Sequence, residues 1–304
     1  MSLLIGSMPD APRSAPPSHP RRLLVIYNAA AGIRPQRRLA RFLDHVERLG
    51  AEAELRRTAR RGDAEAFARS ACGEAFDAVV AAGGDGTVNE VVNGLGDSDM
   101  PLAVLPLGTG NVLANELELP RDARRLARLA AFGTAFPIWP GLLGTRRFVM
   151  LAGIGFDAAV IAGLDEGLKR RVGKLAFALA ILGELRRYEP RRYDVQCSAG
   201  RYRAASAVVV TGRFYAGRFV LAPRGRIADR QLTLVLFMRT GRWAALRYLV
   251  ALGLGRIHRL PDVRTLPAGS VAIGTPVEGD GDILTRLPVE IRLADRPLRV
   301  VRPD

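Results

Sequence analysis

Apolar runs and amphipathic patterns alternate over the first half of the chain. Short apolar runs that end in small or turn-forming residues predict strands at 23–27, 51–57, 78–82 and 101–105. Apolar positions at three- and four-residue spacing predict helices at 35–49 and 63–72, one after the run at 78–82, and one that continues through Glu116. Strands that alternate with helices across short loops are typical of a parallel sheet with crossover helices.

The pattern changes after residue 140. Strands are predicted at 148–151, 193–198, 202–211, 232–238, 263–266 and 271–273, and helices at 169–187 and 243–254. Short strands joined by turns favour a mostly antiparallel sandwich or barrel. A last strand pair at 289–301 could return to either half.

Three segments follow from these patterns. Residues 1–20 carry five prolines and no long apolar stretch, so we expect a disordered tail without a signal peptide. Residues 21–140 form the predicted α/β domain, to which 293–304 could return, and 141–292 form the β-rich domain. A chain of 304 residues is long enough for two separate cores.

A glycine-rich turn follows the apolar run at 78–82. It reads Gly-Gly-Asp-Gly-Thr over 83–87 and opens a helical pattern with Val88, Val91, Val92 and Leu95 on one face. Glycine-rich backbone at a helix N-terminus favours a bound phosphate. Asp85 would repel that phosphate unless a cation or a hydroxyl lay between them, so the turn indicates a nucleotide with Mg²⁺. A plain tight turn with a capping side chain is the simpler alternative.

Composition excludes several kinds of site. The only lysines, Lys169 and Lys174, lie far from any glycine loop, which argues against P-loop and protein kinases. The two cysteines and three histidines form no metal or redox spacing, and two isolated cysteines indicate a reducing compartment. A net charge of +15 favours anionic partners, and without a nucleic-acid-binding motif we expect no nucleic acid.

Membrane contact is expected to be peripheral. No apolar run reaches the roughly 20 residues that span a bilayer. The segment 168–188 has basic ends around an apolar middle, so it could dock on an anionic membrane or cover the β-rich domain. We therefore expect a cytoplasmic protein, peripheral to the inner face of the membrane. The oligomeric state stays open, with a homodimer as one option.

Several ordered motifs resemble the diacylglycerol kinase catalytic-domain family of lipid kinases, which includes sphingosine and ceramide kinases. They are Asn-Ala-Ala-Ala-Gly at 28–32, Gly-Gly-Asp-Gly-Thr-Val-Asn-Glu at 83–90, Leu-Pro-Leu-Gly-Thr-Gly-Asn at 105–111, Gly-Ile-Gly-Phe-Asp at 153–157 and Gly-Arg-Phe-Tyr-Ala-Gly at 212–217. The resemblance implies an NAD kinase-like N-terminal domain, a β-sandwich C-terminal domain and an active site in the interdomain cleft. It also implies Mg²⁺-ATP as donor and a lipid hydroxyl as acceptor.

By the same resemblance, the residues expected to contact ATP are Asn28, Gly32, Thr58, Gly83, Gly84, Asp85, Gly86, Thr87, Asn89, Glu90, Gly108, Thr109 and Asn111. Asp85 would also reach the metal that accompanies ATP. The family's Asp-Gly-Glu, with Glu as proton acceptor, corresponds here to Asp280-Gly-Asp282, so either aspartate could be the base. The family's structural Mg²⁺ site would fall on Arg226, Asp229 and Gln231, where Arg230 adds an unfavourable charge.

The resulting hypothesis is an ATP-dependent lipid kinase that phosphorylates a lipid hydroxyl at an anionic membrane surface. Diacylglycerol is the first acceptor to consider, with ceramide or a sphingoid base close behind. An NAD kinase-like soluble kinase shares the Gly-Gly-Asp-Gly loop, and a catalytically silent nucleotide-binding regulator is the alternative outside enzymes. The sequence does not separate the lipid acceptors, because scattered residues of the β-rich domain would form the acceptor pocket.

Overall fold

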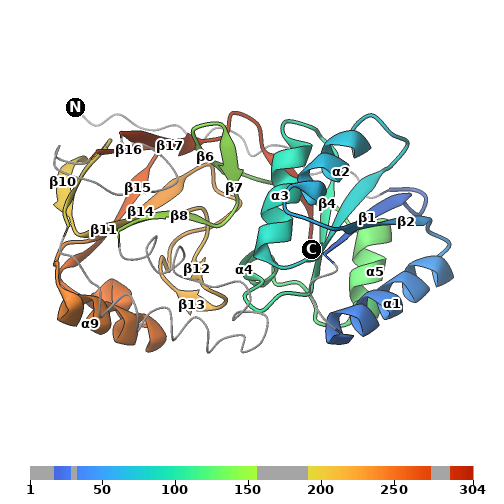
Figure 1. The fold of residues 1–304 in the computed structure, drawn as a ribbon, viewed down its shortest axis with the longest axis horizontal. Helices are drawn as coiled ribbons and strands as arrows, with labels where there is room; N and C mark the ends of the chain where they lie inside the picture. Colours follow the sequence, from blue (N-terminus) through green and yellow to red (C-terminus); the bar gives the residue numbers. More distant parts are fainter. Residues whose placement is uncertain (1–16, 29–32, 156–190, 275–287, 304) are drawn as a thin grey trace.

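The computed structural model describes residues 17–28, 33–155, 191–274 and 288–303 of the chain. Within these ranges the chain forms an α/β domain and a β-sandwich domain that lie side by side (Figure 1). The predicted fold class is therefore confirmed. Residues 17–20, at the end of the expected tail, form neither helix nor strand. No described helix is both long and apolar enough to cross a bilayer.

The α/β domain is built on a six-stranded sheet in the order β2-β1-β3-β4-β18-β5. Its strands are β1 (Leu23–Asn28), β2 (Ala53–Thr58), β3 (Ala78–Gly83), β4 (Leu102–Pro106), β5 (Ala135–Ile138) and β18 (Leu298–Val301). Strands β1 to β4 are parallel, β18 runs parallel to β4, and β5 is antiparallel to β18. The last strand of the chain thus completes the first sheet.

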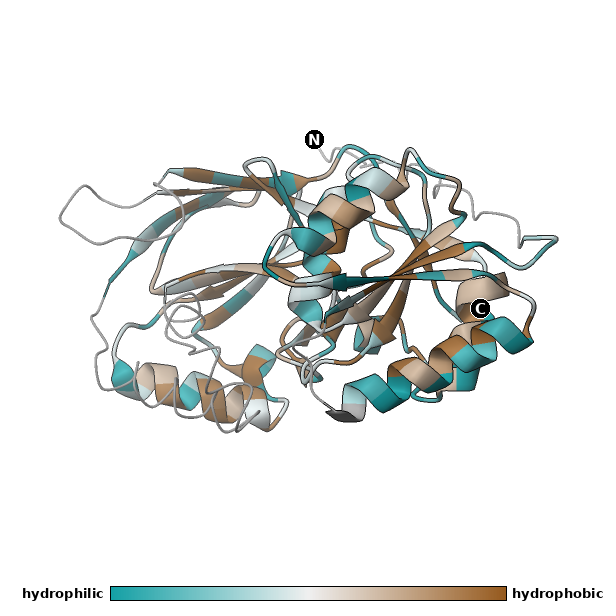
Figure 2. Cartoon of the chain, turned by 45° about the vertical axis from the view of Figure 1, so that its right-hand side comes forward, coloured by the Kyte–Doolittle hydropathy of each residue, from teal (hydrophilic) through white to brown (hydrophobic). Residues whose placement is uncertain are grey.

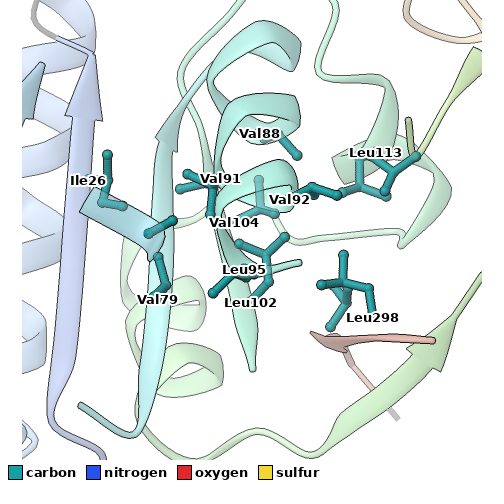
Figure 3. Close-up of a cluster of buried hydrophobic side chains, with 14 of the residues drawn as sticks. Ile26, Val79, Val88, Val91, Val92, Leu95, Leu102, Val104, Leu113 and Leu298 are labelled. Atoms are coloured by element: carbon teal, nitrogen blue, oxygen red, sulfur yellow. The ribbon is translucent and has the colours of Figure 1, made fainter. Parts of the chain in front are cut away.

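Helices cover both faces of this sheet. They are α1 (Ile33–Arg48), α2 (Asp63–Ala71), α3 (Asp85–Leu95), α4 (Val112–Glu116) and α5 (Ala123–Phe132). Alternate residues of β1 show the two layers, because Ile26 packs with α2 and α3 whereas Val25 packs with α1 and α5. Figure 3 shows the first layer, in which Leu298 of β18 lies near the apolar face of α3. A sheet buried on both faces explains the continuous apolar runs of its strands.

The second domain contains two antiparallel sheets. The larger has the order β10-β9-β16-β17-β6-β7 and the smaller the order β15-β14-β11-β8. The larger sheet comprises β6 (Gly141–Leu143), β7 (Arg146–Phe148), β9 (Tyr193–Cys197), β10 (Gly200–Ala204), β16 (Ser270–Gly274) and β17 (Val289–Leu293). The smaller comprises β8 (Leu151–Ile154), β11 (Ser206–Val210), β14 (Leu232–Phe237) and β15 (Val263–Ala268).

The core of the sandwich lies between these sheets, where Val195, Leu234 and Val271 are buried together. The outer face of the smaller sheet is covered by α9 (Arg242–Gly253) and the short helix η2 (Ile257–Arg259). A hairpin of β12 (Phe214–Tyr215) and β13 (Phe219–Val220) lies between this domain and α4 (Figure 1).

Three details of the predicted pattern are wrong. The segment 202–211 is two strands of different sheets, β10 and β11, which separate at Ala205 because its N–H donates to Phe237 O. The segment 148–151 joins the end of β7 to the start of β8. Helix α5 and strand β5 were not identified individually. The predicted helix at 169–187 lies outside the described residues.

Candidate active site

The carboxyl ends of four parallel strands lie in register along one edge of the α/β sheet. Asn28 at the end of β1 pairs with Thr58 at the end of β2, and Gly83 at the end of β3 pairs with Pro106 at the end of β4. Strands β1 and β3 are aligned as well, because Tyr27, the residue before Asn28, pairs with Ala82, the residue before Gly83. Segments that are distant in sequence therefore begin their loops at one edge, where ligands bind in sheets of this kind.

The two glycine loops at this edge touch through their backbones. A Cβ at Gly108 would lie 2.5 Å from the Cα of Gly84, closer than two such atoms can approach. The Leu107 N–H donates to Gly83 O at 2.9 Å, which holds the loops together. Glycine is needed here for close approach of two backbones rather than for an unusual φ.

Asp85 connects the two loops. It is the first residue of α3, and its Oδ1 accepts a hydrogen bond from the Val112 N–H at 2.7 Å, at the start of α4. A Cβ at Gly110 would lie 2.6 Å from its Oδ2, so the second loop also closes against this carboxylate. A carboxylate between two helix N-termini is stabilised by their dipoles and provides an oxygen ligand of the type that Mg²⁺ prefers.

Side chains of the site stiffen both loops. The Asn111 amide donates to Gly108 O at 2.6 Å and accepts from the Gly108 N–H at 2.9 Å. Asn111 adopts a left-handed conformation with φ 48°, which asparagine tolerates better than most residues. The Asn28 amide donates to the Thr87 hydroxyl at 3.2 Å, so β1 is tied to the first turn of α3. The loops are therefore pre-shaped before any ligand binds.

The first turn of α3 also offers open space. Gly86 is exposed, and a Cβ placed on it would meet no atom within 4 Å. Thr109 in the second loop is exposed as well. Farther along α3, Asn89 Oδ1 is buried without a hydrogen-bond partner among the described residues. Glu90 instead accepts from the Gly62 N–H at 3.1 Å, which joins α3 to the start of α2.

These features fit a nucleotide phosphate. The first turn of α3 contains the accessible Gly86, so its backbone N–H groups can donate to a phosphate. The Asn111 side chain holds the second glycine loop in shape, and Asp85 supplies a carboxylate for an accompanying cation. The structure thus brings together Asn28, Thr58 and the described members of the 83–90 and 108–111 loops along one sheet edge. Gly32, Asp280 and Asp282 lie outside the described residues.

The surroundings of Asp229 do not fit a metal ion. Arg226, Asp229 and Gln231 are exposed and form a turn in which the Asp229 N–H donates to Arg226 O at 3.0 Å and the Gln231 N–H to Asp229 O at 2.8 Å. The adjacent Arg230 guanidinium lies 4.7 Å from the Trp139 ring centroid. The described residues contain no group of three potential metal-ligating side chains. One carboxylate beside two arginines is a poor site for a divalent cation.

Helix α4 joins the second glycine loop to the second domain. The Asn115 amide donates to Gly110 O at 3.1 Å and to Gly217 O at 3.0 Å, so it bridges the second loop and the β12–β13 turn. Glu116 Oε1 accepts from the Phe214 N–H at 2.6 Å and from the Arg213 N–H. Its side chain is only 6% exposed, and burial raises the pKa of the Glu116 carboxyl.

A second junction with the β-sandwich domain is made by α3 and α2. The Asn93 amide exchanges hydrogen bonds with the backbone of Arg147 in β7, at 2.9 Å in both directions. The Arg147 side chain donates to Asp97 at 2.5 Å, and Arg146 pairs with Glu65 of α2 at 2.7 Å. The first two turns of α3 and the loop before α4 are therefore held between two interdomain contacts. The arrangement fixes the glycine loops relative to the β sandwich.

Sequence reasoning missed Asn115, Glu116 and Arg38 as supports of this site. Arg38 of α1 donates to Pro106 O at 2.7 Å and to Arg121 O at 2.9 Å, and thus braces the strand that leads into the second loop. Burial lowers the pKa of Arg38. No local signal marks Glu116, because Asn115 precedes it and Glu118 follows, and only the fold shows where its carboxylate points.

Comparison with known proteins agrees with this architecture. Residues 22–138 match the diacylglycerol kinase catalytic domain, and residues 151–302 match the YegS C-terminal NAD kinase beta sandwich-like domain. A diacylglycerol kinase of Bacillus subtilis is 32% identical over 225 residues, which is 72% of this chain and 74% of that protein. A diacylglycerol kinase of Mycobacterium tuberculosis is 28% identical over 275 residues, 86% of each chain.

A solved structure also resembles this fold. The crystal structure of a diacylglycerol kinase from Bacillus anthracis superimposes with a TM-score of 0.72 at 20% identity, over 94% of this chain and 98% of that one. At that identity the likeness concerns the fold. The two domain matches and the Bacillus subtilis relative show the family, and the chain belongs to the diacylglycerol kinase family of lipid kinases.

Proposed function

We propose that this lipid kinase transfers the γ-phosphoryl group of Mg²⁺-ATP to the free hydroxyl of diacylglycerol in a membrane. The observation that carries the proposal is the pair of touching glycine loops at one sheet edge, joined by the Asp85 carboxylate. Mg²⁺ would neutralise charge on the phosphates, as in other phosphoryl transfers. Diacylglycerol is the acceptor that the names of the relatives support.

The roles of the chain's own residues follow from phosphoryl-transfer chemistry, which depends on positioning and electrostatics. The backbone of 83–87 and 108–111 would hold the phosphates, with Thr87 and Asn111 keeping both loops in shape. Asp85 would hold the cation against them. Asp280 or Asp282 would accept the proton of the attacking hydroxyl, directly or through one water.

The test is transfer of a labelled γ-phosphate to lipids in mixed micelles with Mg²⁺. The panel contains diacylglycerol, ceramide, a sphingoid base, monoacylglycerol and phosphatidylglycerol, with NAD in a parallel tube. We expect labelled phosphatidic acid. Label on NAD would instead establish a soluble NAD kinase, and ATP binding without transfer to any acceptor would favour a silent regulator.

A pair of variants distinguishes the activity of this site from that of a contaminating kinase. Asp85→Asn keeps an oxygen that can accept from the Val112 N–H but removes the charge, so we expect kcat to fall at least about 100-fold with little change in stability. Asp44→Asn is the matched control, because Asp44 lies on α1 in an exposed pair with Arg48. Asp44→Asn should match the wild type, and equal activity of the two variants would exclude the proposed role of Asp85.

A further inference from the structure

Helix α9 is apolar on two opposite faces. Ala245, Tyr248 and Ala251 are buried against the outer face of the smaller sheet of the sandwich. Trp243, Leu246, Val250 and, at the C-terminal end, Leu254 point away from it and are 73%, 39%, 53% and 66% exposed. At about 100° per residue, these four positions fall within an arc of roughly 80°. We call these four residues the outer stripe of α9.

The outer stripe is the main exposed apolar surface of the described chain. Among the described residues, the exposed large apolar side chains are the four residues of the stripe and Phe219, which is 46% exposed. Phe219 belongs to β13 of the β12–β13 hairpin, which packs against α9. In Figure 2 apolar residues alternate with polar ones along α9. Contiguous apolar surface of this kind marks an interaction site.

Arginine surrounds the outer stripe. The segment 239–262 contains five arginines and one acidic residue, Asp262, which pairs with Arg239 and Arg247 and leaves Arg242, Arg256 and Arg259 as additional positive charge. Arg239, Arg242, Arg256 and Arg259 are exposed, and Arg242 lies 5.9 Å from the centroid of the Trp243 ring. By helical geometry, Arg242 and Arg247 fall on opposite sides of the stripe. The surface therefore combines an apolar centre with a positive rim.

The helix is held firmly, so the outer stripe has a defined direction. The Tyr248 hydroxyl donates to Asp262 Oδ2 at 2.7 Å and accepts from the Arg239 N–H at 3.1 Å. Asp262 also binds the Arg247 guanidinium. Asp262 is 11% exposed, and although burial alone would raise its pKa, the Tyr248 hydrogen bond and the Arg247 charge lower it. This cluster fastens the inner face of α9 to the sheet.

We propose that the outer stripe of α9 and Phe219 dock on the surface of an anionic lipid bilayer. Tryptophan with leucine and valine is typical of helices that lie in the headgroup region, and nearby arginines attract anionic lipids. A second copy of this chain is a poorer occupant, because a symmetric contact would place arginines against arginines. The segment 168–188 is no better, since it has six basic residues and one acidic residue.

The docking surface belongs to the same domain as the hairpin that contacts α4. The β12–β13 turn reaches the second glycine loop through the hydrogen bond from Asn115 to Gly217. Docking through α9 and Phe219 therefore brings the bilayer to the domain whose hairpin borders the nucleotide loops. The proposed function explains why this protein would bind a membrane, but the binding itself is measured without a lipid acceptor and so is tested independently of kinase activity.

The experiment is co-sedimentation with vesicles of phosphatidylcholine alone or with 30 mol% phosphatidylglycerol, without diacylglycerol or ATP. The test variant is Trp243→Glu with Val250→Glu, two exposed positions whose change leaves the inner face intact. The control is Arg201→Glu with Arg203→Glu, exposed on β10 of the other sheet. We expect at least a tenfold loss of partitioning onto anionic vesicles for the test variant. The control should stay within about threefold of the wild type.

A second measurement uses the fluorescence of the indole itself. The chain has two tryptophans, so Trp139→Phe leaves Trp243 as the only emitter. We expect its emission to shift to the blue when anionic vesicles are added and not when phosphatidylcholine vesicles are added. Unchanged emission, or equal vesicle binding by the test and control pairs, would overturn the proposal. A mass measurement could also show that the wild type and the control are dimers and the test variant is a monomer. If the test variant then still binds vesicles, the outer stripe is a self-association surface and the proposal is overturned.

Discussion

Removal of the Glu116 carboxylate should weaken the contact between α4 and the second domain. In Glu116→Ala the N–H groups of Arg213 and Phe214 both lose their acceptor. The carboxylate is nearly buried and lies against Gly212, where an added Cβ would be 2.5 Å from Oε1.

The magnitude follows from the two orphaned donors. A buried N–H without a partner costs about 1–3 kcal/mol, so the pair costs roughly 2–4 kcal/mol after partial relief by entering water. For a chain of this size about 2–4 °C of thermal midpoint corresponds to each kcal/mol, so we expect a decrease of at least about 4 °C. Activity should fall as well, because Asn115 and Glu116 place the second glycine loop beside the hairpin.

Glu116→Gln is the matched variant. Both backbone N–H groups donate to Oε1, so an amide oxygen can accept both and the midpoint should stay within about 2 °C of the wild type. The assay is thermal unfolding followed by far-ultraviolet circular dichroism, with kcat/KM measured on the same samples. Equal losses in the Ala and Gln variants would refute the reasoning, because the charge rather than the backbone acceptor would then matter.

The pH dependence gives an independent check. Because burial raises the pKa of Glu116 in the folded state, the folded protein binds this proton more tightly than the unfolded chain. The resulting stabilisation is fully present below the pKa of glutamate in the unfolded chain, about 4.3, and is lost as pH rises through the raised pKa of Glu116 in the folded state. Gln does not titrate, so the midpoint of Glu116→Gln relative to the wild type should increase as pH rises. A constant difference between pH 5 and 8 would contradict the assigned shift.

Three further predictions use other contacts. Gly108→Ala should lower both stability and activity, because the new Cβ would lie 2.5 Å from the Gly84 Cα. In Gly86→Ala the new Cβ meets no atom within 4 Å, and the higher helix propensity of alanine should stabilise the protein by up to about 1 kcal/mol. The KM for ATP should nevertheless increase, because the Cβ would occupy the space proposed for a phosphate. Burial and the Asp262 hydrogen bond raise the pKa of Tyr248 to about 12, so absorbance at 295 nm should show a tyrosine that titrates near this value. Asp262→Asn should lower that pKa, and no shift would contradict the contact.

Much of the fold was predictable because periodicity reports burial locally. Runs such as 23–27 and 78–82 are continuous because both faces of their sheet are covered, and the structure has strands at both. The segment 202–211 was predicted as a single strand because its apolar character continues across Ala205. The break depends on the hydrogen bond from Ala205 to Phe237, which is a non-local contact and leaves no local signal.

The final strand pair shows the same limit. The pattern at 289–301 indicated two strands that could return to either domain. In the structure β17 joins the larger sheet of the sandwich whereas β18 joins the α/β sheet between β4 and β5. Strands of four or five residues are too short for their burial pattern to be read from the sequence, so pairing with distant strands decides membership.

By itself, the sequence determined the glycine loops, the position of Asp85 at a helix start and the change from α/β to antiparallel β, because these depend on local backbone freedom and periodic burial. The tertiary structure decided that Gly84 touches Gly108 and that Glu116 holds Phe214, 98 residues away. It also decided that the second apolar face of α9 is left exposed beside arginines. Such contacts arise from the packing of whole sheets and helices, which no local pattern encodes.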